Sequence, residues 1–430
     1  MQFFKYPDRN LWPELLQRPV MDSSKIEEEV EIILLDIKKD GDAALSRHAR
    51  RLGEEIHGNF LVSGSELKAA SKLLDEPLKN SIQHAIRNIK RFHKLQMKAE
   101  SPVEIETGVT CWRKSVPIEC VGLYIPGGTA PLFSTVLMLG IPALLAGCRE
   151  IILCSPPSKN GTIHPAILYA AQKVGIKKVF KVGGPMAIAA MAFGTESIPK
   201  TLKIFGPGNQ YVTTAKQLVQ RAGVAIDMPA GPSELLVWAD ESSVSAYVAA
   251  DLLSQAEHGP DSQVILVTTH SATIENVFLE LENQIKKLPR KDIAWKALKN
   301  SKAFLVRKPE DAIDLINSYA PEHLILSCLN YESVANKIVN AGSVFLGNYT
   351  PESAGDYASG TNHTLPTHGY AKTLSGISCE SFVKKITFQH ISKEGIASLG
   401  NTIEIMAEAE GLTGHKNAVT IRRINHAEKI

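Results

Sequence analysis

The sequence lacks the features that several protein classes require. Only six of its 430 residues are cysteine, and no two of them form a C-x-x-C pair. We therefore expect no cysteine-based zinc or redox motif, and the scattered thiols favour a reducing, cytoplasmic setting. No apolar run reaches the ~18 residues that a membrane span needs. The most apolar stretch, 136–146, is interrupted by Gly140 and Pro142.

An excess of charge of one sign is also missing. Lys and Arg number 47 and Asp and Glu number 45, which gives a formal net charge of +2. This balance argues against a basic protein that coats nucleic acid and against an acidic disordered tail, so we expect no nucleic-acid partner. The first residues, MQFFKYPDRNLWPELL, contain acids and prolines early, and we expect neither a signal peptide nor a membrane partner.

The sequence does contain a regular alternation of strands and helices. Strand-like and helical runs alternate over 118–228 and again over 234–348. This pattern predicts an α/β fold with parallel sheets and helices on their faces. The first hundred residues and the last fifty read as helices. Residues 349–378 read as one long polar loop, a type that is often functional.

Neither common nucleotide motif is present: no strand is followed by G-x-G-x-x-G, and there is no P-loop. Two Gly-rich strings follow strands, YIPGG at 124–128 and FGPGNQY at 205–211. Each is either a plain tight turn or a seat for phosphate on helix N–H groups. Both are expected at the carboxyl ends of parallel strands, where ligands of open α/β sheets bind.

Several histidines lie in polar or Gly/Pro-rich strings beside acids or an amide. The pairs are Gln255 and His258 at the end of a helix, Glu322 and His323 at a helix-to-strand junction, and Asp356 and His363 in the long loop, with His415 near the C-terminus. Singly, each has an ordinary explanation, such as a helix-end histidine or an Asx-turn. Jointly, two histidines, an amide and one carboxylate would form a site that suits zinc better than manganese or cobalt. Spacing alone leaves their convergence open.

These strings resemble those of the histidinol dehydrogenase family over roughly residues 20–422. The matching strings are VGLYIPGGTAPLFSTVLMLGIPA, FGPGNQYVT, IDMPAGPSE, DLLSQAEHGPDSQVIL, APEHL, AGSVFLGNYTPESAGDYASGTNHTLPT and HKNAV. The resemblance implies two incomplete Rossmann-like parallel-sheet domains with small helical N- and C-terminal extensions. It also implies a homodimer with NAD and one Zn²⁺ per subunit.

The resemblance further implies domain boundaries. Residues 1–20 would be an extension, and 21–123 with 233–377 a discontinuous α/β domain that carries most site residues. Residues 124–232 would form the NAD-side domain, and 378–430 a helical tail exchanged across the dimer.

Residue roles follow from the same resemblance. Glu322 and His323 match the catalytic acid–base pair. The zinc ligands would be Gln255, His258, Asp356 and His415, and the substrate contacts would be these four together with Ser233, His323, His363 and Glu410. Glu410 and His415 would complete the site of the other protomer. The NAD contacts would be Tyr124, Met186 and Asn209; Met186 stands where the family usually has Gln, and a thioether cannot donate the amide's hydrogen bonds.

The reaction implied is oxidation of L-histidinol through L-histidinaldehyde to L-histidine with two NAD. His323 would take the hydroxyl proton, and Glu322 would activate water for the second oxidation. Three alternatives are weighed against it. One is oxidation of another small polar alcohol with the same fold and metal, one is a zinc hydrolase without NAD, and one is a non-catalytic binding protein or scaffold.

Overall fold

A computed structural model describes residues 1–19, 24–51, 59–127, 131–229 and 231–427. Gly128 of the YIPGG string therefore lies outside the described residues. The chain divides into two compact units. The larger comprises 1–96 and 118–382, and the smaller comprises 97–117 and 383–430. Among the described residues, no helix is long and apolar enough to cross a bilayer.

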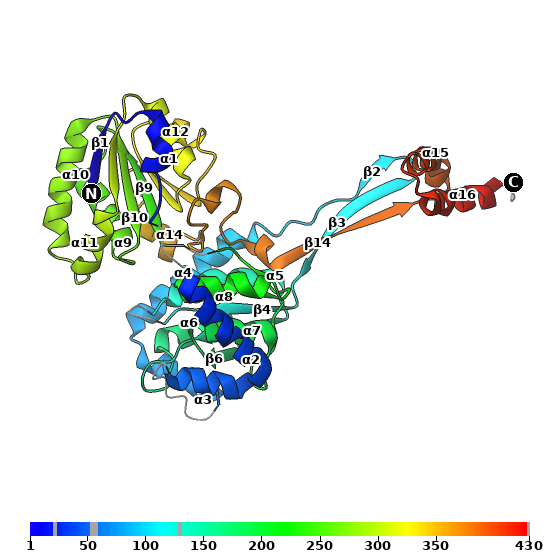
Figure 1. Cartoon of the computed structure of the whole chain (residues 1–430), viewed down its shortest axis with the longest axis horizontal. Helices are drawn as coiled ribbons and strands as arrows, with labels where there is room; N and C mark the ends of the chain where they lie inside the picture. The colour runs from blue at the N-terminus through cyan, green and yellow to red at the C-terminus, as the bar shows by residue number, and fades with distance from the viewer. Residues whose placement is uncertain (20–23, 52–58, 128–130, 230, 428–430) are drawn as a thin grey trace. The chain divides into compact units, whose positions relative to one another are not determined.

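The larger unit contains a six-stranded parallel sheet, here called sheet A (Figure 1). Its spatial order is β1 (Gln2–Lys5), β11 (Lys302–Leu305), β10 (Gln263–Thr268), β9 (Glu234–Ala239), β12 (His323–Ser327) and β13 (Ser343–Leu346). Alternate side chains of a strand point to opposite faces. Leu235 and Val237 accordingly pack with one group of helices, α9 (Ser245–Ala256), α10 (Ser271–Ile285) and α11 (Lys291–Lys299). Leu236 and Trp238 pack on the other face, with α1 (Trp12–Leu15) and α12 (Pro309–Tyr319), and α13 (Tyr331–Ala335) also lies against this face.

A second parallel sheet, sheet B, has five strands in the larger unit (Figure 1). Its order is β6 (Lys178–Lys181), β5 (Glu150–Ser155), β4 (Cys120–Tyr124), β7 (Lys203–Phe205) and β8 (Ala225–Ile226). The helices between these strands are α5 (Phe133–Ala146), α6 (Pro165–Val174), α7 (Gly184–Phe193) and α8 (Gln210–Gln220). The predicted α/β class with two parallel sheets is confirmed.

The packing of the N-terminal helices differs from the predicted grouping of 21–123 with 233–377. Helix α2 (Ser24–Arg51) packs on α7 and α8, α3 (Gly64–Ala70) on α6, and α4 (Glu76–Lys94) on α5. The apolar face of α2, with Val30, Leu34 and Ile37, belongs to the same buried cluster as the sheet B residues Ile152 and Ile204. Hydrophobic complementarity therefore attaches these helices to sheet B and not to sheet A.

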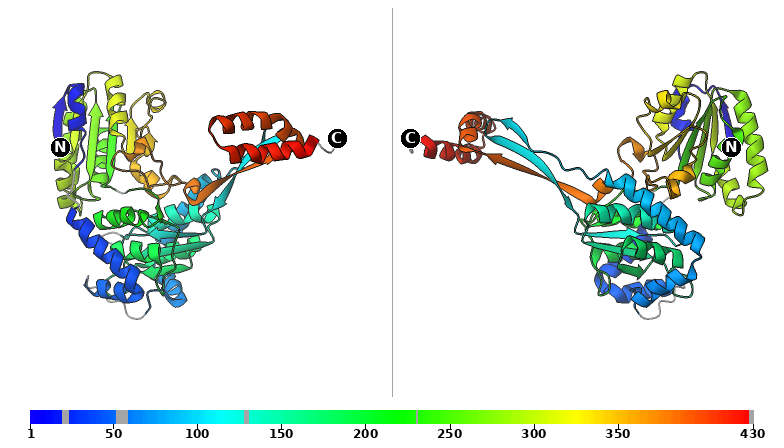
Figure 2. Two further views of the ribbon diagram at one scale, coloured as in Figure 1. Left: turned by 45° about the vertical axis from the view of Figure 1, so that its right-hand side comes forward. Right: turned by 180° about the vertical axis from the view of Figure 1, so that it is seen from behind.

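The smaller unit is an antiparallel sheet followed by two helices (Figures 1 and 2). Strand β3 (Val109–Pro117) pairs with β2 (Val103–Glu106) on one side and with β14 (Val383–Ile391) on the other. Helices α15 (Lys393–Ala409) and α16 (Thr413–Ala427) then pack against each other. The expectation that 378–430 is helical throughout is thus wrong for β14. Its largely exposed residues lack the apolar run that identified the strands of the two parallel sheets.

Ordered helical turns also interrupt the predicted loop 349–378. Helix α14 (Glu352–Tyr357) and a 3₁₀ turn at Tyr370–Lys372 lie within it. Glu352 and Gly355 are buried, so this stretch packs inward and carries the Glu352 side chain with it. The loop prediction was therefore wrong for these residues.

Candidate active site

The predicted acid–base pair lies at the amino edge of sheet A, where its parallel strands begin. Helix α12 ends before Ala320, which has a left-handed φ of +54°, and β12 begins at His323. This places Glu322 and His323 beside Glu234, the first residue of the neighbouring strand β9. The helix-to-strand junction expected from the sequence is confirmed, and both side chains are buried.

The backbone of Glu234 fixes the orientation of this pair. Its N–H donates to Glu322 Oε2 at 2.9 Å, and its carbonyl oxygen lies 3.2 Å from His323 Nδ1. Gln255, in the last turn of α9, donates its Nε2 to the same carbonyl at 3.1 Å, and this nitrogen lies 3.1 Å from His323 Nδ1. A carbonyl only accepts, so a proton on Nδ1 points to Glu234, and Nε2 is the ring nitrogen that faces Asp356.

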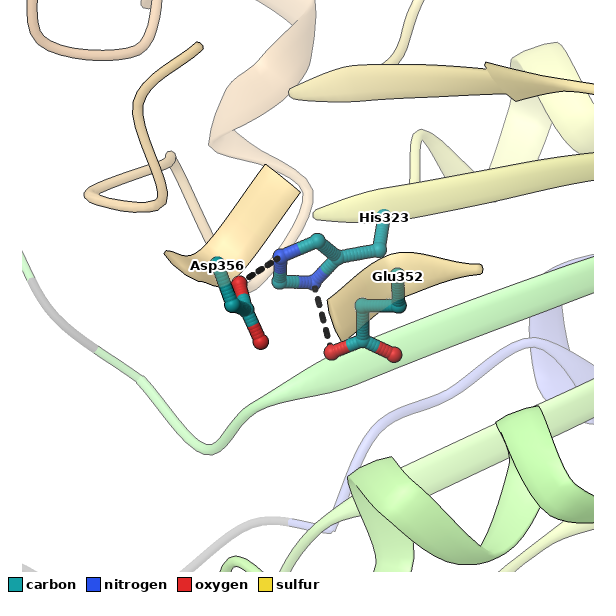
Figure 3. Close-up of side chains that lie close together, drawn as sticks. All are labelled: His323, Glu352 and Asp356. Atoms are coloured by element: carbon teal, nitrogen blue, oxygen red, sulfur yellow. Dashed lines mark ion pairs between the residues drawn. The ribbon is translucent and has the colours of Figure 1, made fainter. Parts of the chain in front are cut away.

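Three carboxylates surround the His323 ring. Glu322 Oε2 and Glu352 Oε1 lie 3.6 and 3.7 Å from Nδ1, and Asp356 Oδ1 lies 3.7 Å from Nε2. Figure 3 shows the ring between Glu352 and Asp356, both of which α14 supplies. His323, Glu352 and Asp356 form a group whose ligand atoms all lie within 4.8 Å of one another, close enough to hold one cation.

The pKa values in this cluster show that it is short of positive charge. Burial disfavours the imidazolium, but the carboxylates of Glu352, Glu322 and Asp356 outweigh it and raise the pKa of His323 to about 10. Burial raises the pKa of Glu322 to about 7 and moves the pKa of Glu352 well above its ordinary value. Burial also acts to raise the pKa of Asp356, but its interaction with His323 prevails and holds it below the usual range. One imidazole ring, that of His323, thus lies among the three carboxyl groups of Glu322, Glu352 and Asp356.

Three buried polar atoms in this cluster have no hydrogen-bond partner among the described residues: Gln255 Oε1, His323 Nε2 and Glu352 Oε2. Leaving a buried polar atom unpaired costs about 1–3 kcal/mol, so native proteins rarely leave three together. An amide oxygen and a carboxylate oxygen are hard donors that suit a cation or a donor group of a substrate. The cluster therefore has the chemistry of a ligand site.

The other sequence-predicted residues of the larger unit lie around this edge or beside it. Ser233 immediately precedes β9, and its backbone oxygen accepts from Gln263 N. His258 follows α9 and lies within the electrostatic reach of Asp356 and His323. His363 is 3.0 Å through Nδ1 from the carbonyl oxygen of Asp356 and 3.1 Å through Nε2 from Thr135 Oγ1. Glu410 and His415 belong to the smaller unit, at the end of α15 and the start of α16.

The predicted NAD contacts lie at the carboxyl edge of sheet B. Tyr124 ends β4, and its hydroxyl accepts from the N–H of Gly184 at the start of α7. Asn209 caps α8 by accepting from Val212 N at 3.1 Å. Met186 is buried in the hydrophobic core.

A buried ion pair holds the loop before Asn209. Lys216 Nζ contacts Asp227 Oδ1 and donates to the Gly206 carbonyl oxygen at 2.8 Å, and Asp227 Oδ2 accepts from Gly206 N at 2.8 Å. Gly206 has a φ of +134°, and a Cβ there would meet the Tyr124 carbonyl oxygen at 2.1 Å. Only glycine fits this position, so the FGPGN string has a fixed shape.

Sequence reasoning missed Glu352. The signal is present as Glu352 and Asp356 in TPESAGDY, because residues four apart share one face of a helix. The polar composition of 349–378 predicts a loop, and a loop prediction hides that helical spacing.

Comparison with known proteins gives one consistent result. A family model described as histidinol dehydrogenase matches residues 16–423. Histidinol dehydrogenase of Bacteroides thetaiotaomicron is 56% identical over 422 residues, which cover 98% of this chain and 99% of the relative. That of Escherichia coli K12 is 50% identical over 412 residues, which cover 95% and 94%. The crystal structure of histidinol dehydrogenase from Elizabethkingia anophelis matches with a TM-score of 0.98 at 53% identity and covers 99% of each chain.

The parallel sheets and the buried imidazole among carboxylates define an α/β enzyme that can move protons beside a bound ligand. The chain belongs to the histidinol dehydrogenase family. It is accordingly an oxidoreductase, which disfavours the hydrolase and scaffold alternatives.

Proposed function

We propose that this protein oxidises L-histidinol through L-histidinaldehyde to L-histidine, with two NAD and one zinc ion per subunit. The observation that carries the proposal is the convergence of Gln255, His323 and Asp356 at the amino edge of sheet A, with Gln255 Oε1 and His323 Nε2 unpaired. Family membership supplies the substrate class.

Gln255 and Asp356, which both contact the His323 ring, fit a zinc ion. We assign its ligands as Gln255, His258 and Asp356, with His415 from a second copy of the chain. Gln255 Oε1 is buried and lacks a partner, and the surrounding acids leave the cluster in need of a cation. When bound, zinc supplies a Lewis-acidic anchor for the imidazole and amine of the substrate, and NAD supplies the hydride acceptor.

The proton chemistry belongs to His323 and Glu322. The neutral ring of His323 takes the hydroxyl proton at Nε2 as the carbinol loses hydride, since Nδ1 is held by the Glu234 carbonyl; the charge of a bound cation would offset the carboxylates that favour the protonated ring. Glu322 takes a proton from the water that adds to the aldehyde, and its pKa near 7 suits a base that works at neutral pH. The protonated His323 gives its proton to the aldehyde oxygen as water adds, and the neutral ring then takes a hydroxyl proton from the hydrate during the second oxidation.

The remaining assignments concern binding. Ser233 and His363 contact the substrate beside Gln255, His258, Asp356 and His323, and Glu410 of a second copy pairs with the substrate ammonium. Tyr124 and Asn209 contact NAD, where the N-termini of α7 and α8 favour its phosphates. Met186, buried beneath this edge, can give only an apolar contact.

The smaller unit supports a homodimer. It exposes large apolar side chains on its sheet and on both of its helices, namely Val103, Ile105, Ile386, Phe388, Ile405, Met406, Ile421 and Ile424. Exposed large apolar side chains in this number favour a protein interface. We propose that a second copy covers them and that the tails exchange.

Complementation tests the exchange. We mix His323→Ala, which has an intact tail, with His415→Ala, which has an intact acid–base pair. If tails exchange, one site of each mixed dimer is intact and the mixture recovers about a quarter of wild-type activity. If each subunit completes its own site, the mixture stays as inactive as its components.

The reaction is tested by measuring NADH formed per L-histidinol consumed, with and without a zinc chelator. Two NADH per substrate, lost on chelation and restored by zinc, is the expected result. A zinc-loaded dimer that makes no NADH from histidinol but makes it from another small polar alcohol would overturn the substrate assignment.

A further inference from the structure

We propose that Arg18 is a positioning residue of the active site, which acts through Glu234 to hold His323, Gln255 and Glu322 in place. The inference deepens the proposed function and rests on it. It starts from an arginine outside the acid–base and ligand sets, which lies in the N-terminal segment that follows α1.

Arg18 binds the carboxylate of Glu234 through two hydrogen bonds. Its Nε lies 2.5 Å from Oε1, and its Nη2 lies 2.8 Å from Oε2. The Glu234 side chain is 2% exposed, and His368 N also donates to Oε1 at 2.7 Å. A planar guanidinium fits a carboxylate in this forked manner, whereas an ammonium cannot reproduce both bonds in the same plane.

The backbone of Glu234 is the common support of the acid–base pair and Gln255. Its N–H binds Glu322, and its carbonyl oxygen accepts from both His323 and Gln255. A displacement of this single residue would therefore move all three side chains. The chain before it, 229–232, reads Pro-Ala-Gly-Pro, and its prolines lack the N–H groups that pair backbone in a sheet. The side-chain anchor therefore adds to the bonds of Gly231 N with Thr367 and of Ser233 O with Gln263 N in fixing the start of β9.

Arg18 also binds the helix end that leads into the neighbouring strand β12. Its Nη2 donates to the carbonyl oxygens of Tyr319 at 2.7 Å and Ala320 at 3.3 Å, and its guanidinium stacks on the Tyr319 ring at 4.0 Å. These carbonyls end α12 and have no partner within the helix. They immediately precede Glu322, and Ala320 holds a left-handed φ that is unfavourable for a residue with a Cβ. One guanidinium thus joins the starts of β9 and β12.

The test compares Arg18→Lys with a matched control, Arg9→Lys. Arg9 lies in the same N-terminal segment and also bonds to α12, through Asp311 and Asp314, but it is half-exposed and remote from Glu234. We expect Arg18→Lys to lower kcat for both oxidations about tenfold to a hundredfold, because small misplacements of reacting groups have effects of that size. The KM for NAD should stay within about twofold, since the sheet B edge is untouched. Arg9→Lys should leave all constants unchanged.

A second measurement does not depend on turnover. The buried Nδ1 proton of His323 should give a downfield proton resonance in zinc-free protein, assigned by its loss in His323→Gln. We expect it in the wild type and in Arg9→Lys, and expect it shifted or lost in Arg18→Lys. Folded Arg18→Lys with wild-type kcat and an unchanged resonance would overturn the inference. A wild type that does not oxidise histidinol would overturn the proposed function, and the resonance would still decide the role of Arg18.

Discussion

The two parallel sheets offer their functional residues at opposite edges. In sheet B, Tyr124 ends β4 and Asn209 follows the end of β7, at the carboxyl edge where open α/β sheets bind ligands. In sheet A, Glu322 and His323 precede or begin β12, and Gln255 reaches the same amino edge from the end of α9. The predicted NAD contacts and the acid–base cluster thus lie at opposite edges of the same kind of sheet.

The difference follows from helix polarity. Helices α7 and α8 begin at the carboxyl edge of sheet B, and their N-termini carry partial positive charge that favours phosphate. Helices α9 and α12 end at the amino edge of sheet A, and their C-termini carry partial negative charge that favours a cation. The topology thus suits sheet B to the anionic part of a dinucleotide and sheet A to a metal ion and an ammonium group.

The largest effect is expected at the sheet A edge. His323→Ala should lower kcat for both oxidations by about 10²–10⁴, the range for loss of a general base, with the affinity for NAD retained. Single-turnover assays with histidinol and with histidinaldehyde measure each step, and a binding titration measures NAD. If His323→Ala lowered the affinity for NAD as much as it lowered kcat, the two sheet edges would not act separately.

A substitution that disrupts the sheet B edge should instead impair NAD binding and leave zinc binding intact. Lys216→Met leaves the buried carboxylate of Asp227 unpaired and frees the Gly206 carbonyl, so we expect a loss of about 3–5 kcal/mol in unfolding free energy. The KM for NAD should rise about tenfold as the 206–209 loop loses its shape, with little change in zinc content.

Lys181→Met provides the matched control for Lys216→Met. It removes a less buried ion pair, with Glu66, from the same half of the unit. It should leave the KM for NAD unchanged. An equal rise in both variants would assign the effect to general destabilisation.

A smaller and selective effect is expected at Glu322. Glu322→Gln keeps an acceptor for the Glu234 N–H but cannot take a proton from water. The rate of alcohol oxidation should stay within about threefold of the parent rate, and the rate of aldehyde oxidation should fall about a hundredfold. Oxidation of histidinaldehyde at the parent rate would contradict the water-activating role.

The smallest effect concerns stability and pH. Burial raises the pKa of Asp251, on α9, to about 7 from 3.8. Because the folded-state pKa is raised, ionised Asp251 destabilises the fold, and this cost grows as pH rises from about 4 to 7 and is complete above 7. Asp251→Asn should therefore stabilise zinc-free protein by about 1–2 kcal/mol at pH 8 and by less at pH 5. Urea unfolding measures this, with exposed Asp292→Asn as the control; an equal gain at both pH values would contradict the assignment.

The sequence predicted the parts of the fold that have strong local signals. Buried strands such as Leu235–Ala239 are continuous apolar runs, and the alternation with helices identified both parallel sheets. Strands β2, β3 and β14 were not predicted, because they form a largely exposed antiparallel sheet without such runs. The packing of α2 on sheet B escaped because amphipathicity shows that a helix has a buried face without showing what covers it.

The candidate site was predictable where a motif placed chemistry at adjacent positions, as with Glu322 and His323. The convergence of Gln255 on the same ring depends on the return of α9 to the amino edge, which spacing along the chain does not reveal. The roles of Glu234 and Arg18 could not be predicted from the sequence for a further reason. Glu234 supports the site through its backbone, and Arg18 acts at one remove, through Glu234.

The most direct test of the central claim is anomalous diffraction at the zinc edge from crystals of the zinc-loaded protein. We predict one peak per subunit at the amino edge of sheet A, bonded to Gln255 Oε1, His258 and Asp356. A peak at any other place, or a zinc-loaded crystal with Gln255 Oε1 still unpaired, would contradict it.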